Sequence, residues 1–472
     1  MFGLDISLTL LLIFCITAAL SFEFINGFHD TANAVATVIY THSLKPRTAV
    51  IWSGIWNFIG VNVGGIAVAV GIINLLPIEA LTDSNIYHNL AMILALIFTA
   101  ILWNLGTWYL GIPCSSSHTL LGSIFGVGIA YMLLPGSHDI LLNWGKVKDV
   151  GLSLLISPFF GFFMAMLLMF VLQKVVKNKI IFKEPPAKKA PPMWIRSVLV
   201  LTCTFVSFSH GSNDGQKGVG LMMIILIAIV PVKFAIDHTK DPIALHGNVI
   251  AMNSMLAQVD SSQLSKTNKV AFGEIVAGLD TIDGILAGLT TFKDITREGS
   301  LEARRNILIV SKKSDNLLKI LAEKPIPSIN SSWVNEYRKQ ISEMKTYTEY
   351  APLWVILAIA ISLGLGTMVG WKRIVVTIGE KIGKSHLTYA QGASAELIAA
   401  GTITVSSMFG LPVSTTHVLS SGVAGTMVAG SGFKNLQQKT VASIGIAWLI
   451  TLPVTILFSG MLFLLFRLLF GV

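Results

Sequence analysis

Two short motifs place carboxylate, amide and imidazole side chains among long apolar runs of the sequence. They cover residues 27–33 and 211–217. The residues in them that could do chemistry are His29, Asp30, Asn33, Asn213, Asp214 and Lys217. Ionisable groups at membrane depth are costly, so they usually line a site and find partners there. Gly27 also permits a helix break at the first motif. One such motif could be a surface loop, but its recurrence favours a binding site.

A second pair of motifs puts three hydroxyl residues in a row after a glycine and a proline. The two runs, each followed by a histidine, are Ser115, Ser116, Ser117 with His118, and Ser414, Thr415, Thr416 with His417. Proline removes a backbone donor and interrupts a helix. The N-terminus of a new helix exposes N–H groups and binds anions. Two such ends facing each other would hold a tetrahedral oxyanion, whereas hydroxyls that only join helices are the alternative.

Three further ionisable residues could move charge. Histidine changes charge near neutral pH, so His118 and His417 could each relay a proton or simply orient the turn by hydrogen bonding. Glu396 lies sixteen positions before Pro412, and the matching position in the first half is Ile97. Glu396 could therefore bind a cation or carry a proton, or it could be a carboxylate at a helix end.

The composition indicates a membrane protein. Hydrophobic residues make up 53% of the chain and charged residues 12%, against about 25% charged residues in soluble domains. Five runs are long enough for apolar helices to cross a bilayer, namely residues 5–22, 89–112, 149–173, 352–370 and 440–471. Alternating strand patterns are absent from the sequence, which argues against a barrel. The net charge of +9 fits basic loops beside anionic lipid rather than a nucleic-acid partner.

The spacing of the motifs predicts a duplication with one insertion. Asp30 and Asp214 are 184 positions apart, while His118 and His417 are 299 apart. The difference of 115 matches a polar, charged stretch with helical periodicity in the second half. We expect five segments: residues 1–176 (first repeat), 177–193 (basic linker), 194–233 (start of the second repeat), 234–350 (helical extramembrane insertion) and 351–472 (rest of the second repeat).

Loop charge predicts the orientation. Residues 174–196 carry seven Lys or Arg against one Glu, so by the positive-inside rule this stretch is cytoplasmic. If the halves are inverted repeats, as in many transporters, both chain termini lie outside. The insertion is then expected outside as well.

The two motif pairs and their order resemble the inorganic phosphate transporter (Pit-type) family of low-affinity phosphate permeases, over residues 1–233 and 351–472. The resemblance implies an all-α polytopic membrane protein of two inverted repeats, with about ten spans and two re-entrant hairpins. It also implies a homodimer in the inner or plasma membrane. It implies phosphate contacts from both hydroxyl runs and Asn213. It further implies places beside the coupling ion for Asp30, Asn33 and Asp214.

Two departures from the family pattern concern the coupling ion. His29 stands where the family has Asn, and Lys217 stands where the first half has Asn33. A fixed ammonium supplies the positive charge that a bound cation would otherwise supply, and it cannot itself bind Na⁺. We therefore expect proton coupling, or transport of a neutral metal–phosphate complex. Sodium-coupled symport remains the alternative.

The predicted function is secondary active import of inorganic phosphate by alternating access. An anion channel and a phosphate sensor or receptor are alternatives of other classes. A hydrolase is disfavoured because the adjacent Ser117 and His118 point in different directions on a helix. The sequence has no nucleotide-binding motif, and Cys15, Cys114 and Cys203 have no metal-ligand spacing. We therefore expect no enzyme activity, no cofactor and no intrinsic metal.

Overall fold

The computed structural model describes residues 3–77, 80, 85–134, 142–186, 189–323 and 329–472, without the side chains of residues 31–33 and 378. The described residues form helices and loops, with no β-strand among them. They fall into two compact units. The larger unit comprises Ile6–Pro77, Leu90–Ile225 and Ala351–Val472, and the smaller is mainly Leu226–Tyr350.

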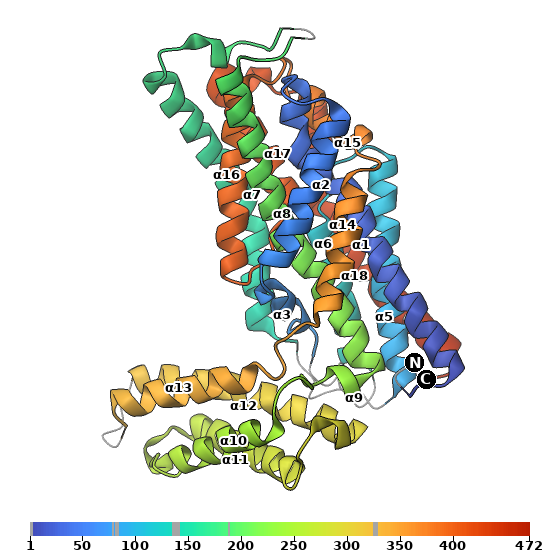
Figure 1. The fold of residues 1–472 in the computed structure, drawn as a ribbon, viewed down its shortest axis with the longest axis vertical. Helices are drawn as coiled ribbons and strands as arrows, with labels where there is room; N and C mark the ends of the chain where they lie inside the picture. Colours follow the sequence, from blue (N-terminus) through green and yellow to red (C-terminus); the bar gives the residue numbers. More distant parts are fainter. Residues whose placement is uncertain (1–2, 78–79, 81–84, 135–141, 187–188, 324–328) are drawn as a thin grey trace. The chain divides into compact units, whose positions relative to one another are not determined.

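Long apolar helices dominate the larger unit (Figure 1). Five helices among the described residues are long and apolar enough to cross a membrane: α1 (Ile6–Tyr40), α5 (Ile86–Tyr109), α7 (Trp144–Val175), α8 (Met193–Ile229) and α18 (Gln438–Phe470). Two bent pairs could add one span each. The first pair joins α2 (Pro46–Val63) to α3 (Ala67–Ile73) at 73°, and the second joins α14 (Leu353–Thr367) to residues Lys372–Lys381 at 56°. The predicted helical membrane architecture is thus present, while the count of about ten spans stays a prediction.

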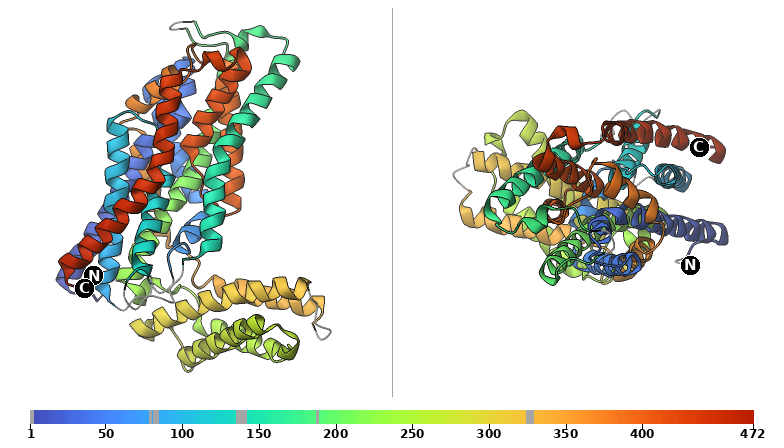
Figure 2. Two further views of the ribbon diagram at one scale, coloured as in Figure 1. Left: turned by 180° about the vertical axis from the view of Figure 1, so that it is seen from behind. Right: turned by 90° about the horizontal axis from the view of Figure 1, so that it is seen from above.

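The remaining helices of the larger unit are shorter. They are α6 (Ser116–Met132), η1 (Lys179–Phe182), α15 (Lys372–Val376), the π-helical turn η4 (Thr377–Lys381), α16 (Tyr389–Met408), α17 (Thr415–Ser431) and η5 (Phe433–Asn435). The view from behind in Figure 2 shows α18 running along the helix bundle. In each half the helix that follows a hydroxyl run packs on the last helix of the other half, α6 on α18 and α17 on α7. This exchange is what two related repeats would produce, and their inverted orientation stays a prediction.

Gly27 does not break its helix, so that expectation was wrong. α1 continues from Ile6 to Tyr40 through the whole first motif. Gly27 instead lets α14 approach closely, since a Cβ there would collide with the backbone of Leu363. Gly211 in α8 plays the same part against Asn57 of α2. The glycines thus bring the motif helices against the neighbouring bent pairs, which fixes the side chains that follow them.

The smaller unit is helical, as the periodicity of the insertion predicts. Its helices are α9 (Pro231–Phe234), α10 (Pro242–Leu256), η2 (Ser261–Gln263), α11 (Lys266–Leu286), η3 (Phe292–Asp294), α12 (Arg297–Glu323) and α13 (Ser331–Lys345). Helices α10 to α13 pack in a closed cycle around one apolar core (Figure 1). The extramembrane position of this unit remains a prediction.

A buried arginine joins the two ends of the smaller unit. Arg304 Nη1 donates to the carbonyl oxygens of Ala235 (2.9 Å) and Thr348 (3.1 Å). Burial lowers the pKa of Arg304 to about 10. Because a buried cation costs free energy unless it is hydrogen-bonded, this contact ties the entering and leaving chain segments together.

Candidate functional site

Both hydroxyl runs begin a new helix, at the positions the sequence predicts. Ser115 caps α6 by accepting from the N–H of His118, and Ser414 caps α17 by accepting from the N–H of His417, each at 3.1 Å. The chain reaches each cap through a glycine with positive φ, Gly111 at 66° or Gly410 at 64°. The first N–H groups of a helix have no acceptor inside the helix. Each end therefore offers backbone and hydroxyl donors.

Asp30 lies where the two helix ends meet. Its Oδ2 accepts from Ser116 Oγ at 2.8 Å, and its Oδ1 accepts from Thr416 Oγ1 at 2.7 Å. His29 Nδ1 lies 3.1 Å from the same Oδ1. The Asp30 side chain is 1% exposed, so these donors replace its hydration. One carboxylate from α1 thus receives hydroxyl groups from both halves of the chain.

Lys217 connects the second motif to the starts of α6 and α17, called the first turn (residues 111–117) and the second turn (residues 410–416) below. Its ammonium lies 2.5 Å from Asp214 Oδ1 and 2.5 Å from Ser117 Oγ, and it donates to the carbonyl of Val413 at 2.9 Å. Ser117 Oγ also donates to that carbonyl at 2.8 Å. The side chains of Lys217 and Asp214 are both buried. A buried ammonium with one carboxylate and two oxygen partners is a closed ion pair rather than a free charge.

His210, one helical turn before Asp214, was missed by the sequence reasoning. Its Nε2 lies 3.3 Å from Asp214 Oδ2 and 3.9 Å from Asp30 Oδ2. Its Nδ1 lies 2.9 Å from Asn57 Oδ1, which orients the ring. Spacing of i and i+4 puts His210 on the same helix face as Asp214, and that signal could have identified it. Asp30, His210, Asp214 and Lys217 are called the central cluster below.

Glu23 was also missed, although it lies two helical turns before Asp30 on the same face of α1. It is fully buried and accepts from Asn26 Nδ2 at 3.3 Å. Its side chain lies against Gly218 of α8, where any Cβ would overlap it. An acidic residue seven positions before Asp30 inside an apolar run was the available signal.

His29 joins Asp30 to α5, and Asn213 contacts the turn before α17. His29 Nε2 lies 3.3 Å from Thr107 Oγ1 in α5. Asn213 donates to Ser407 Oγ at 2.9 Å and accepts from the N–H of Val413 at 3.3 Å. Asn213 therefore contacts the backbone of the second turn directly. The structure gives it a positioning contact, and a phosphate contact stays a prediction.

The two histidines that close the hydroxyl runs lie beside each other. The rings of His118 and His417 are 4.4 Å apart, and His417 stacks on Trp448 at 4.0 Å. His118 Nδ1 lies 2.9 Å from Ser115 Oγ. Thr415, on the same helix end as His417, is buried. Stacking and the Ser115 contact account for the His118 ring, whereas His417 Nε2 is buried without a hydrogen-bond partner among the described residues. Proton transfer by either histidine stays a prediction.

Glu396, a predicted carrier of the coupling ion, has a hydrogen-bond contact outside the central cluster. Glu396 is fully buried in α16 and accepts from Thr202 Oγ1 of α8 at 2.5 Å. Asn33 lies in α1, but its side chain is outside the described residues.

Three groups of the central cluster could together hold a cation. One ligand atom each of Asp30, His210 and Asp214 lies within 4.8 Å of the others, and all three residues are buried. Two carboxylates and an imidazole suit a divalent transition metal, whereas carboxylate oxygens also suit Mg²⁺. The Lys217 ammonium beside Asp214 reduces the negative charge available to such an ion.

The fold and site together define a helical, multi-pass membrane protein with a buried polar site at two helix N-termini. A family model described as "Phosphate transporter family" matches residues 26–459. The chain belongs to this phosphate transporter family, as the sequence motifs predict.

Relatives match almost the full length. The chain is 40% identical to the "Low-affinity inorganic phosphate transporter PitA" of Escherichia coli (strain K12), covering 98% of this chain and 97% of the relative. It is also 40% identical to PitB of that strain, with the same coverage. Because these relatives are named as transporters, the chain is classed as a transporter and not an enzyme.

A solved structure supports the fold. "The sodium-dependent phosphate transporter" is similar with a TM-score of 0.52 and 20% identity, covering 97% of this chain and 99% of that one. At this identity the similarity concerns the fold and not the coupling ion.

Proposed function

We propose that this chain imports inorganic phosphate as a secondary active transporter that works by alternating access. The observation that carries this proposal is the convergence of two helix N-termini, one from each half, on Asp30. Ser116 and Thr416 already donate to two oxygen atoms of one anion there. A phosphate ion has the oxygens to accept from the same hydroxyls and from N–H groups at both helix ends. The Escherichia coli relatives are named as inorganic phosphate transporters.

Lys217 supplies positive charge next to these donors. Its ammonium already contacts Ser117 Oγ, so it lies beside the first hydroxyl run, where the phosphate ion would bind. A phosphate group carries between one and two negative charges near neutral pH. The cation therefore offsets part of the charge that would otherwise enter a low-dielectric site.

We propose the proton as the coupling ion, with Glu396 as its carrier. Two observations support this choice. Lys217 sits on Asp214, which leaves less negative charge for Na⁺. Glu396 is a fully buried carboxylate, and its counterpart in the first half is the apolar Ile97. A sodium-coupled symporter is the alternative.

A neutral metal–phosphate complex is the second candidate cargo. The donor set of Asp30, His210 and Asp214 favours it, because a divalent cation there would bring its own charge compensation for phosphate. The ion would enter and leave with phosphate as substrate. Phosphate uptake that requires Mg²⁺ would support this form.

We further propose a homodimer in the inner or plasma membrane, with residues 174–196 on the cytoplasmic side. The basic linker and the family resemblance support this arrangement. An anion channel or a phosphate sensor would differ in a measurable way. A channel would let phosphate flow only down its own electrochemical gradient, without accumulation against it, and a sensor would bind phosphate without net uptake.

Uptake of radiolabelled phosphate into proteoliposomes tests the proposal. pH and sodium gradients are imposed separately, each with and without Mg²⁺. Ser116→Ala and Thr416→Val should each raise the KM for phosphate by roughly 10- to 100-fold, since each removes a hydrogen bond to a charged group. Thr402→Val is the matched control, because that hydroxyl donates to Ile398 O of its own helix. Unchanged uptake kinetics in both site variants would refute the assignment.

A further inference from the structure

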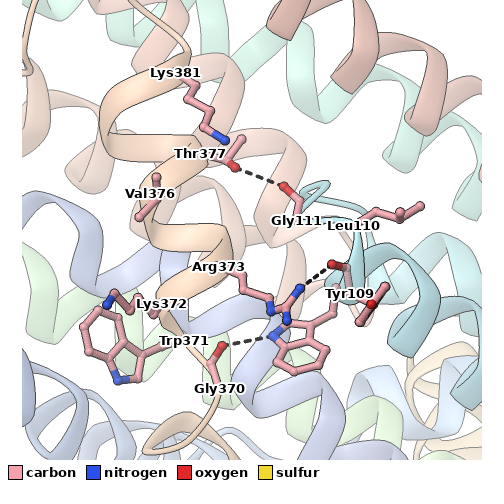
Figure 3. Close-up of a pocket in the computed structure, with 11 residues that line it drawn as sticks. Tyr109, Leu110, Gly111, Gly370, Trp371, Lys372, Arg373, Val376, Thr377 and Lys381 are labelled. Carbon is pink, nitrogen blue, oxygen red and sulfur yellow. Dashed lines mark hydrogen bonds between the residues drawn. The ribbon is translucent and has the colours of Figure 1, made fainter.

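A pocket separate from the central cluster lies where α15 and η4 pass the turn at Gly111, which precedes the first hydroxyl run. Its volume is about 680 Å³. One wall is the end of α5 and the turn at Gly111, and the other is Gly370–Lys381 (Figure 3). Its lining combines three cations and three aromatic rings, namely Lys372, Arg373, Lys381, Trp108, Tyr109 and Trp371. None of these residues belongs to the central cluster.

Arg373 is held in place as a ligand-binding group. Its Nη1 donates to the carbonyl of Tyr109 at 2.6 Å, a bond drawn in Figure 3. Its Cζ lies 5.1 Å from the Trp108 ring and 5.0 Å from the Tyr109 ring. Trp108 is itself fixed by a 2.9 Å hydrogen bond to the carbonyl of Gly370. A positioned guanidinium is the preferred partner of a phosphate group because its N–H groups match the oxygens in pairs.

The positive charge of the pocket is not neutralised by its lining. No Asp or Glu is among the lining residues, and Glu380 of η4 is not one of them. A smaller neighbouring pocket shares Gly111, Thr377 and Lys381 and adds Lys439. Four basic side chains thus face two adjoining cavities. All four side chains are exposed, so the pockets present their positive charge to solvent, where it raises the local concentration of anions.

The corresponding place beside the second turn has one cation, Lys146, whose Nζ would lie 3.6 Å from a Cβ on Gly71 of α3. There α3 takes the position of α15 and η4, and a Cβ on Gly410 would lie 3.0 Å from the carbonyl of Ala67. The sequence of α3 is Ala-Val-Ala-Val-Gly-Ile-Ile, and most of it is buried. Beside the first turn the pocket lining instead gathers three cations, Lys372, Arg373 and Lys381.

The pocket is joined directly to the first turn. Thr377 Oγ1 donates to the carbonyl of Gly111 at 3.0 Å (Figure 3). Gly111 has a φ of 66° and precedes the Ser115 cap by four residues. Thr377 lies in the π-helical turn η4, a form that often marks functional sites. A ligand bound in the pocket would therefore contact the segment whose Thr377 is hydrogen-bonded to the turn before the first hydroxyl run.

The surroundings indicate which phosphate compound is available there. Just after η4, the N–H of His386 donates to Glu184 in the basic linker at 3.2 Å. The pocket thus belongs to the end of the unit that carries the linker, for which the sequence predicts the cytoplasmic side. Trp and Tyr are typical of the membrane interface, and the cytoplasmic leaflet is rich in anionic lipid. Tyr109 and Leu110 are 66% and 69% exposed, a surface suited to acyl chains.

We propose that this pocket binds a phosphate-bearing anion through Arg373 and Lys381, while Lys372, which points away from Arg373 (Figure 3), adds to the positive charge around it. The headgroup of an anionic phospholipid is the first source, and free inorganic phosphate at the cytoplasmic end is the second. Both present the same oxygen atoms to the same cations. Bound there, the anion neutralises the pocket and stabilises the first turn through Thr377.

Native mass spectrometry of the purified full-length chain with phosphatidylglycerol or phosphatidylcholine tests the lipid source. Equilibrium dialysis with inorganic phosphate tests the other. Lys372→Gln/Lys381→Gln should weaken phosphatidylglycerol binding by about 10- to 30-fold and leave phosphatidylcholine binding unchanged. If free phosphate is the occupant, Lys372→Gln/Lys381→Gln should instead bind one phosphate ion fewer per chain than the unchanged protein does.

Lys434→Gln is the matched control, an exposed lysine at the same end, next to Asn435, which bonds Ser385. Arg373→Lys is a second variant that keeps the charge and loses the paired N–H groups, and it should weaken the same ligand. Thermal unfolding verifies that each variant is folded. Lipid and phosphate binding that both match the Lys434→Gln control would overturn the proposal.

Discussion

Replacing Lys217 by methionine should destabilise the protein and stop uptake, because the central cluster depends on one ammonium. The Lys217 ammonium contacts Asp214, Ser117 and the carbonyl of Val413 at 2.5–2.9 Å. Methionine keeps most of the volume and removes the charge. The carboxylate of Asp214 is then left buried without an ammonium partner, with the His210 ring 3.3 Å away.

The expected cost follows from the burial of the pair. Removing one partner of a buried ion pair costs roughly 3–5 kcal/mol, which corresponds to roughly 100- to 5,000-fold in an equilibrium constant. In Lys217→Met/Asp214→Asn the unpaired charge is gone, so most of the loss in unfolding free energy should be recovered. Phosphate uptake should stay low in the double variant because the positive charge beside the hydroxyl run is still missing.

Two measurements separate these effects. Unfolding in detergent gives the relative stabilities of Lys217→Met, Asp214→Asn and the double variant, and proteoliposome uptake gives KM and kcat. Lys217→Arg serves as a control that keeps the charge with a different shape. The reasoning fails if Lys217→Met loses less than about 1 kcal/mol, the size of an exposed pair, or if the double variant is no more stable than Lys217→Met.

Three further predictions use other parts of the structure. Glu396→Gln should abolish uptake driven by a pH gradient while phosphate exchange between equal concentrations continues, and equal loss of both would contradict a coupling role. Gly211→Ala should lower the unfolding midpoint because its methyl group would overlap the backbone of Asn57, whereas Gly106→Ala, with nothing within 4 Å, should not. Arg304→Met should destabilise the smaller unit by about 3 kcal/mol, since two carbonyls lose charged donors. Amide hydrogen exchange that is slower or unchanged in the smaller unit of Arg304→Met would argue against a stabilising role for Arg304.

The helix ends could be predicted from the sequence because their signals are local. Proline and a run of hydroxyl residues identify a helix start within one turn of chain, and α6 and α17 begin where expected. The helical insertion was found from composition and periodicity. The matched motif spacing predicted the duplication, and the exchange of partners between α6 and α17 agrees with it.

Contacts between distant segments could not be predicted in the same way. Nothing local indicates that Ser116 and Thr416 share one carboxylate, because that depends on how the halves pack. His210 was overlooked because the first half has Asn26 at the matching position, so the repeat comparison did not draw attention to it. Gly27 was misinterpreted because a glycine that allows a helix break also allows close helix packing, and here packing of α1 on α14 decides.

The two hydrogen bonds to Asp30 have a consequence for affinity. A phosphate ion that takes the hydroxyls of Ser116 and Thr416 must first displace a carboxylate built into α1. Such a tethered competitor acts at high effective concentration, so apparent binding is weaker than the contacts alone would give. The same competitor returns when phosphate leaves, which spares the buried hydroxyls the cost of losing their acceptor. Asp30 would then set an upper limit on affinity and also let the unloaded carrier reset.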